Sequence, residues 1–148
     1  MKVSGLLLFV LLVFTGGSIF AQGIDGVWRG YFFSGGDSVK IVIELQTRGN
    51  IITGKSYTRH YEPGGHLDIT CSIEGRISGD SITFREKKVI EMKPYFKNTN
   101  CLQQFSLTLL VAPDRKRSMT GNWKGTAAYC GKGKAYFTER KSRESNYP

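Results

Sequence analysis

The residues of this chain that could do chemistry are few, and their spacing indicates binding rather than catalysis. No pair of carboxylates falls at a spacing that brings both into one site, no serine lies in a nucleophile elbow, and no glycine-rich loop is built to hold phosphate. His60 and His66 flank a turn with acidic neighbours, which could bind zinc, but an exposed polar hairpin tip explains the same pattern. We therefore expect no catalytic residue, no metal, no cofactor and no enzymatic activity.

Glu86 is the most informative acidic residue, because it continues an inward alternation set by residues 82 and 84. An unpaired buried charge is costly, so a carboxylate there needs polar partners, and several polar residues on other segments share its inward parity. An apolar pocket with a few convergent polar groups is how small-molecule sites are built. The residues predicted to contact a ligand are Trp123, Glu86, Ser56 and Gln103, with Tyr95 and Phe96 from a long connection. Alternatively, the strand bends and Glu86 reaches solvent.

Strands are the elements that must position these side chains, because from Gly26 onward the apolar residues recur at every second position. The clearest run is SVKIVIELQ, and turn signals such as FSGGD, TRGN and ISGD separate one run from the next. We find no amphipathic helix of useful length. The predicted strands are 26–33, 38–47, 51–59, 66–77, 81–89, 101–112, 117–126 and 131–140.

This strand series predicts an all-β fold: an eight-stranded antiparallel up-and-down β-barrel. Mostly short connections favour a meander of sequential hairpins, and closure removes both exposed sheet edges. The interior of such a small barrel is filled by side chains or holds one small ligand. An open β-sandwich is the main alternative.

The two tryptophans occur in nearly the same phrase, GVWRG at 26–30 and GNWKG at 121–125. The first and last strands of a closed meander are neighbours, so we expect the guanidinium of Arg140 to stack over the indole of Trp28 at one end of the barrel. Trp123 falls near the other end and points inward. The flanking glycines are expected to leave room for each indole against a curved sheet. Both tryptophans could also be core residues alone.

The Gly-x-Trp at 26–28 and the basic Arg140 on the last strand resemble the calycin group of barrels, which contains lipocalins, fatty-acid-binding proteins and avidin-like proteins. Lipocalins carry Gly-x-Trp on the first strand and a basic residue on the last strand, packed across the closed end. The number and order of the predicted strands fit this group, and the bare meander looks closest to avidin. The resemblance implies a cup for a small apolar ligand, but it transfers no ligand-binding residue.

The connections and the cysteines indicate which end is the mouth of the cup. The turns at the Trp28 end are tight, whereas the longest connection, 90–100, lies at the other end, where binding usually resides. Cys101 and Cys130 are equidistant from the turn between the sixth and seventh strands, so we predict a Cys101–Cys130 disulfide. Cys71 is expected to be a buried small hydrophobe, with a Cys71–Cys101 bridge as the alternative.

Residues 1–21 have the pattern of a secretory signal peptide: a short positive start, an apolar run and Ala21 before the predicted cut. An uncleaved membrane anchor is the alternative. Cleavage leaves 22–148 as a single β-barrel domain without a membrane span. We expect a secreted or periplasmic location, where a disulfide is stable.

The formal net charge of +9 allows a polyanionic partner such as an acidic glycan, although scattered basic residues are more often a solvated surface. Outward aromatic and basic residues are too sparse for us to expect nucleic acid binding. The function that we expect is non-catalytic binding of a small apolar ligand in the cup. The alternative is a protein-interaction or inhibitor module of the cell envelope that acts through its loops or its basic surface.

Overall fold

The computed structural model describes residues 23–94 and 101–140, and this part of the chain is all-β. The predicted signal peptide, Tyr95 and Phe96 lie outside the described residues. No helix within 23–94 and 101–140 is long and apolar enough to cross a membrane. The strands are β1 (Gly26–Ser34), β2 (Asp37–Arg48), β3 (Ile51–Glu62), β4 (Gly65–Ser78), β5 (Ser81–Lys93), β6 (Gln103–Val111), β7 (Arg117–Gly125) and β8 (Lys132–Glu139), with a 3-10 turn, η1 (Ala128–Cys130), before β8.

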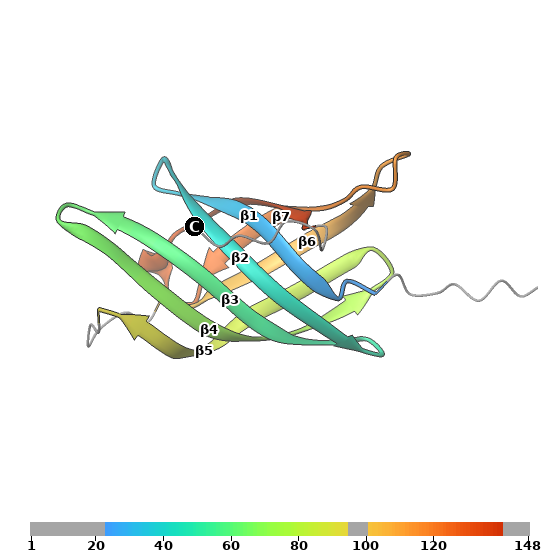
Figure 1. Cartoon of the computed structure of the whole chain (residues 1–148), viewed down its shortest axis with the longest axis horizontal. Helices are drawn as coiled ribbons and strands as arrows, with labels where there is room; N and C mark the ends of the chain where they lie inside the picture. Colours follow the sequence, from blue (N-terminus) through green and yellow to red (C-terminus); the bar gives the residue numbers. More distant parts are fainter. Residues whose placement is uncertain (1–22, 95–100, 141–148) are drawn as a thin grey trace, which may run out of the picture.

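The strands form one closed antiparallel barrel in sequence order, as predicted (Figure 1). β1 pairs with β8 over Trp28–Phe32, which closes the barrel, and the amide of Arg140 donates a further hydrogen bond to the carbonyl of Val27. An open sandwich is therefore excluded. The strand bounds agree with the prediction to within two residues, except that β3 and β5 run further, to Glu62 and Lys93.

The closed end is plugged by Trp28, but the cation above its indole is Arg117 and not Arg140. The guanidinium carbon of Arg117 lies 5.4 Å from the centroid of the Trp28 ring. Its Nε donates to Glu139 at 2.7 Å, and its Nη1 donates to the carbonyl of Gly23 at 2.6 Å. The indole Nε1 of Trp28 donates to the carbonyl of Ile24 at 2.9 Å, so the segment before β1 also covers this end.

Strand parity explains why the prediction for Arg140 was wrong. Trp28 pairs with Glu139, and Phe137 on the same strand is buried, so the odd positions of β8 face the interior. Arg140 follows Glu139 and therefore has the opposite parity. Arg117 lies two residues before the buried Met119 on β7 and faces inward. The basic residue was expected on the last strand, but the inward-facing one is on the strand beside it.

The interior beyond this plug is packed with aromatic and aliphatic side chains. Phe84 and Phe105 stack with ring centroids 4.8 Å apart, and Phe137 lies 5.7 Å from Phe105. Phe32 continues the row towards Trp123, with their ring centroids 4.7 Å apart. Most of the barrel is therefore a filled core, and only the end beyond Trp123 and Phe32 leaves space.

Gly30 and Gly125, one from each of the two repeated motifs, make room for neighbours other than the tryptophans. A Cβ on Gly30 would lie 2.5 Å from the Phe137 ring and against the carbonyl oxygen of Tyr136. A Cβ on Gly125 would collide with the Cβ of Cys130. Gly30 thus permits close approach of β1 and β8, and Gly125 permits the disulfide to lie beside β7.

Candidate functional site

A small cavity lies inside the barrel beside the Cys101–Cys130 disulfide, at the end opposite Trp28. Its volume is about 210 Å³. Strands β1, β3, β4, β5, β6 and β7 all contribute to its wall, so the closed barrel is what assembles it. The lining residues are Phe32, Ser34, Thr58, His60, Leu67, Ile69, Cys71, Glu86, Val89, Cys101, Leu102, Gln103, Trp123 and Cys130.

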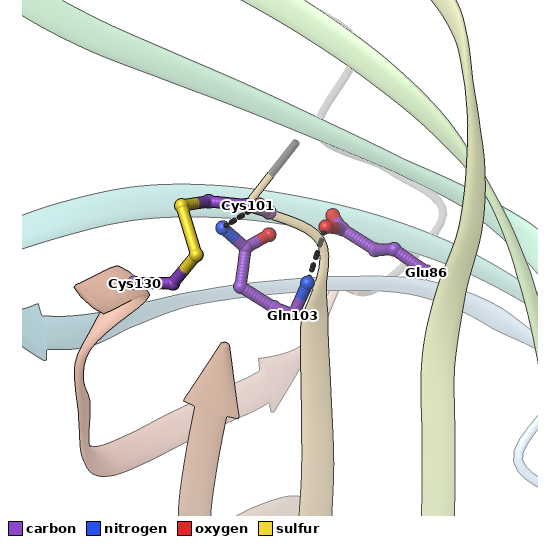
Figure 2. The surroundings of a disulfide bond; sticks show 4 residues. All are labelled: Glu86, Cys101, Gln103 and Cys130. Atoms are coloured by element: carbon purple, nitrogen blue, oxygen red, sulfur yellow. Dashed lines mark hydrogen bonds between the residues drawn. A yellow bond between two sulfur atoms is a disulfide. The ribbon is translucent and has the colours of Figure 1, made fainter. Parts of the chain in front are cut away.

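Glu86 reaches into this cavity and is 3% exposed, so the alternative in which it points to solvent is wrong. The hydroxyl of Ser56 donates a hydrogen bond to one carboxylate oxygen at 2.5 Å, and the backbone amide of Gln103 donates to the other at 2.9 Å. Figure 2 shows the carboxylate of Glu86 directed across to the start of β6, next to the disulfide. The carboxylate thus links β3, β5 and β6 through the barrel interior.

Glu86 lies just beyond the last paired residues of β5 and β6, and this explains why its carboxylate accepts a hydrogen bond from the backbone amide of Gln103. The register between β5 and β6 runs from Ser81–Thr108 to Arg85–Gln104 and ends there. The next amide on β6, that of Gln103, receives the side chain of Glu86 as its acceptor instead. Gln103 itself turns back, and its Nε2 donates to the carbonyl of Cys101 at 3.1 Å.

Burial raises the pKa of Glu86, because an apolar surrounding disfavours the ionised form. The hydrogen bonds from Ser56 and from the Gln103 amide act in the opposite direction but are smaller effects. The carboxyl group is therefore easier to protonate than one in water. It can offer a ligand either a hydrogen-bond donor or an acceptor.

Trp123 forms one wall of the cavity and is fixed from two sides. Its indole Nε1 donates to the carbonyl of Phe33 at 2.8 Å, and its ring packs on Phe32. The side chain is 3% exposed, so it is both a core residue and a cavity residue. Because its only polar atom is already bonded, Trp123 presents a ligand with a rigid apolar surface.

An irregularity in β5 brings Val89 into the cavity, although simple alternation from Glu86 would direct it outward. The register between β4 and β5 shifts between Thr70 and Cys71 and again between Ser72 and Ile73, so two residues of β5 lack a partner on β4. Val89 lines the cavity as a result. The sequence prediction missed Val89, together with Phe32, Leu67, Ile69 and Leu102.

The disulfide was predicted correctly: Cys101 and Cys130 are bonded, with their Cα atoms 5.4 Å apart. Cys71 is free and buried, and it also lines the cavity. Burial, with a smaller contribution from the nearby Glu86, raises the pKa of the Cys71 thiol to about 12. A thiol with this pKa stays protonated near neutral pH and is a poor nucleophile.

The histidine-flanked turn of β3 and β4 is organised by an ion pair. Arg59 binds Asp68 through two hydrogen bonds, of 2.6 and 2.9 Å, and His66 Nε2 lies 3.5 Å from the same carboxylate. The Arg59 guanidinium lowers the pKa of Asp68. Within the described ranges, no group of three or more His, Cys, Asp and Glu side chains could hold a metal ion.

The chain matches no family model, and a comparison with curated proteins gives no significant match.

Proposed function

We propose that this protein is a secreted or periplasmic, non-catalytic binding protein of calycin type, which holds a small apolar ligand at the disulfide end of its barrel. The observation that carries the proposal is the cavity enclosed by Trp123, Phe32, Leu67 and Val89, with Glu86 as its buried carboxyl group. An apolar wall with one oriented polar group is the usual design of a small-molecule site. The disulfide supports an oxidising compartment.

The volume of the cavity limits the ligand to a compact molecule. An engineered apolar cavity of about 150 Å³ binds benzene. A cavity of about 210 Å³ accommodates a ring with a short substituent rather than a long acyl chain. The apolar part of the ligand would pack on Trp123, and a polar substituent would face Glu86.

Thermal unfolding with compact aromatic probes tests the proposal. Toluene and benzyl alcohol should each raise the Tm, because a ligand that binds only the folded state stabilises it by about 2.7 kcal/mol at 100 times its Kd. Trp123→Ala should abolish the rise. Since that variant also removes core packing, Thr58→Met provides a second test, because it fills space inside the cavity.

The matched control is Thr53→Met, which makes the same substitution at an exposed position of the same strand. It should keep the full Tm rise. The proposal fails if no probe raises the Tm of the unaltered protein, or if Thr58→Met and Thr53→Met respond alike. If the probes do bind as expected, native mass spectrometry of protein purified from its own host would identify the natural ligand.

A further inference from the structure

An aromatic cluster lies on the outer surface of the barrel, where β1 meets β8. The ring centroid of Tyr31 lies 5.4 Å from that of Phe33 and 5.7 Å from that of Tyr136. These side chains are 39%, 46% and 37% exposed, respectively. They alternate with the buried Phe32 and Ala135, so they belong to the solvent side of the wall and are not required by the core.

Basic side chains surround this cluster. Lys40 on β2 is directly opposite Tyr31, and Arg29 precedes Tyr31 by two positions on β1. On the other side, Lys132 pairs with Lys124 of β7, and Lys134 lies between Lys132 and Tyr136 on the same face of β8. All of these cations are exposed. We call the surface formed by the aromatic cluster and its cations the basic face: Arg29, Tyr31, Phe33, Lys40, Lys124, Lys132, Lys134 and Tyr136.

The charge of the basic face is not compensated by carboxylates. The outward positions of β1, β7 and β8 carry no Asp or Glu, since Glu139 faces inward and binds Arg117. None of the cations of the basic face takes part in an ion pair with a described residue. Pairs such as Arg85–Glu74 and Arg59–Asp68 lie instead on β3, β4 and β5.

The basic face therefore carries a local positive charge with no carboxylate among its outward side chains, whereas the opposite wall mixes ion pairs with exposed cations such as Lys55, Arg76 and Lys88. A surface with one sign of charge attracts a partner of the opposite sign and speeds their encounter. The aromatic rings at its centre add a flat apolar area that a simple solvated surface does not need. The partner that fits must therefore present anionic groups and flat apolar faces together.

We propose that the basic face binds an anionic polysaccharide. The sulfate or carboxylate groups of the polymer pair with the lysines, and the C–H faces of its sugar rings pack on Tyr31, Phe33 and Tyr136. This site lies on the outside of the barrel and is independent of the cavity. Mutations can therefore remove polysaccharide binding at the basic face without affecting ligand binding in the cavity, and the reverse.

Two other polyanions, single-stranded nucleic acid and an anionic membrane, fit the basic face less well than a polysaccharide does. Single-stranded nucleic acid also combines stacking with cation contacts, but the Cys101–Cys130 bridge favours a compartment outside the reducing cytosol. A membrane surface recruits aromatic side chains by burying them among the head groups. The rings of the basic face lie against one another along a strand pair instead, which suits an extended polymer.

Binding to immobilised dextran sulfate and polygalacturonate at 150 mM NaCl tests the proposal, with neutral dextran as the uncharged polymer. The protein should bind at least one anionic polymer, and the tighter of the two identifies whether sulfate or carboxylate is preferred. Binding should weaken as salt is raised, because exposed charges are screened. The variant K124Q/K132Q/K134Q should lose at least tenfold in affinity.

The matched control is K55Q/R76Q/K88Q, which removes the same charge from exposed positions on β3, β4 and β5. It should change affinity less than twofold. Equal losses in the two variants would show that net charge alone drives binding and would overturn the proposal. So would an absence of binding, equal binding to neutral dextran, or tighter binding to oligo-dT or to phosphatidylglycerol vesicles.

The aromatic part of the site is tested without any change of charge. Y31A/Y136A should lose at least fivefold in affinity for the preferred polysaccharide while keeping its dependence on salt. The control Tyr129→Ala removes a tyrosine that is 80% exposed on η1, three residues before Lys132 but outside the aromatic cluster, and should bind normally. Circular dichroism confirms that each variant is folded. An unchanged affinity in Y31A/Y136A would contradict a specific polysaccharide site.

Discussion

Glu86 places an ionisable group inside an otherwise apolar interior, so it links the stability of the barrel to pH. Its pKa is raised above the ordinary value of 4.5 because of burial. The folded state therefore holds the proton more tightly than the unfolded chain does. The contribution of this group to stability is fully present below pH 4.5 and is lost as the pH rises through the folded-state pKa.

Glu86→Gln should consequently stabilise the protein at pH 7.5 and make little difference at pH 4. The amide has no charge to bury, its carbonyl can accept from the Gln103 amide, and its NH₂ can donate to Ser56. The measurement is chemical denaturation at both pH values. Glu74→Gln is the control. Because Lys87 and Arg85 lower the pKa of Glu74, its charged form favours the folded state, and this variant should destabilise the protein at pH 7.5. A Glu86→Gln variant that is less stable at pH 7.5 would contradict this account.

Arg117 and Arg140 test the assignment of the closed end. Arg117→Ala removes the cation above Trp28 and leaves Glu139 without that guanidinium, so it should cost about 1–3 kcal/mol. Arg140→Ala removes the same charge and should cost less than about 0.5 kcal/mol. Urea unfolding of the two variants measures both values. The original sequence interpretation would be restored if Arg140→Ala proved the more damaging.

Alternation along the sequence predicts which side chains point into the barrel where a strand is regular, but not where the strand contains a bulge. Ser56, Gln103 and Trp123 lie inside the barrel as their alternation indicated. Val89 could not be assigned, because a bulge reverses the parity that follows it and leaves no clear mark in the sequence. The choice of Arg140 followed from its place near the end of the last strand, beside the start of the first, and the alternation of β8 would have argued against it.

At the scale of elements, a disulfide joins the chain before the β6–β7 hairpin to the chain that follows it. It links Cys101, two residues before β6, to Cys130, two residues before β8, with a sequence separation of 29. Gly125 makes room for it, and the amide of Gly125 donates to the carbonyl of Gly131 at 2.9 Å. This clamp keeps the start of β6, and with it the amide that binds Glu86, in place.

Cys101→Ser/Cys130→Ser should lower the free energy of unfolding by about 3–4 kcal/mol, the loop-entropy value for a closed loop of this length. Guanidinium unfolding measures the loss, and reduction of the unaltered protein should reproduce it. Cys71→Ala is the control, because Cys71 forms no bridge. The Cys71→Ala variant keeps the disulfide, so reduction should destabilise it by the same amount as the unaltered protein. A change of less than about 1 kcal/mol in the double variant would show that the clamp is not needed.

Element bounds were predictable from turn signals, except where a hairpin continues beyond its apolar run. β3 and β4 pair as far as Glu62–Gly65, although the residues near that turn are polar. The pairing there is sustained by the backbone ladder and by the Arg59–Asp68 ion pair. A hydrophobic pattern cannot report such an extension, because it detects only the face that is buried.

For the whole molecule, closure of β1 against β8 is the feature on which both proposed sites depend. Gly30→Ala should destabilise the protein by about 1–3 kcal/mol, because its Cβ would force the strands apart at Phe137. Gly65→Ala is the matched control, since a Cβ there meets nothing within 4 Å. Thermal unfolding compares the two variants. Equal Tm values would contradict the close approach at this seam.

The barrel itself could be predicted from the sequence because strand number, hairpin spacing and alternation all agree. The small size of the cavity could not, since it depends on how far Phe32, Phe84 and Phe105 fill the interior. A basic surface and a polyanionic partner were among the expectations, but the position of that surface could not be predicted. Its residues come from β1, β2, β7 and β8, and only the closure of the barrel places these strands side by side.

The early end of the β5–β6 register has a consequence for how the interior exchanges with its surroundings. β5 continues to Lys93 along β4, while its register with β6 stops at Arg85–Gln104. In Figure 1 the end of β5 stands apart from β6. Hydrogen exchange beyond Arg85 should therefore be faster for the β5 amides on the β6 side than for those that pair with β4, because they have no strand partner on that side.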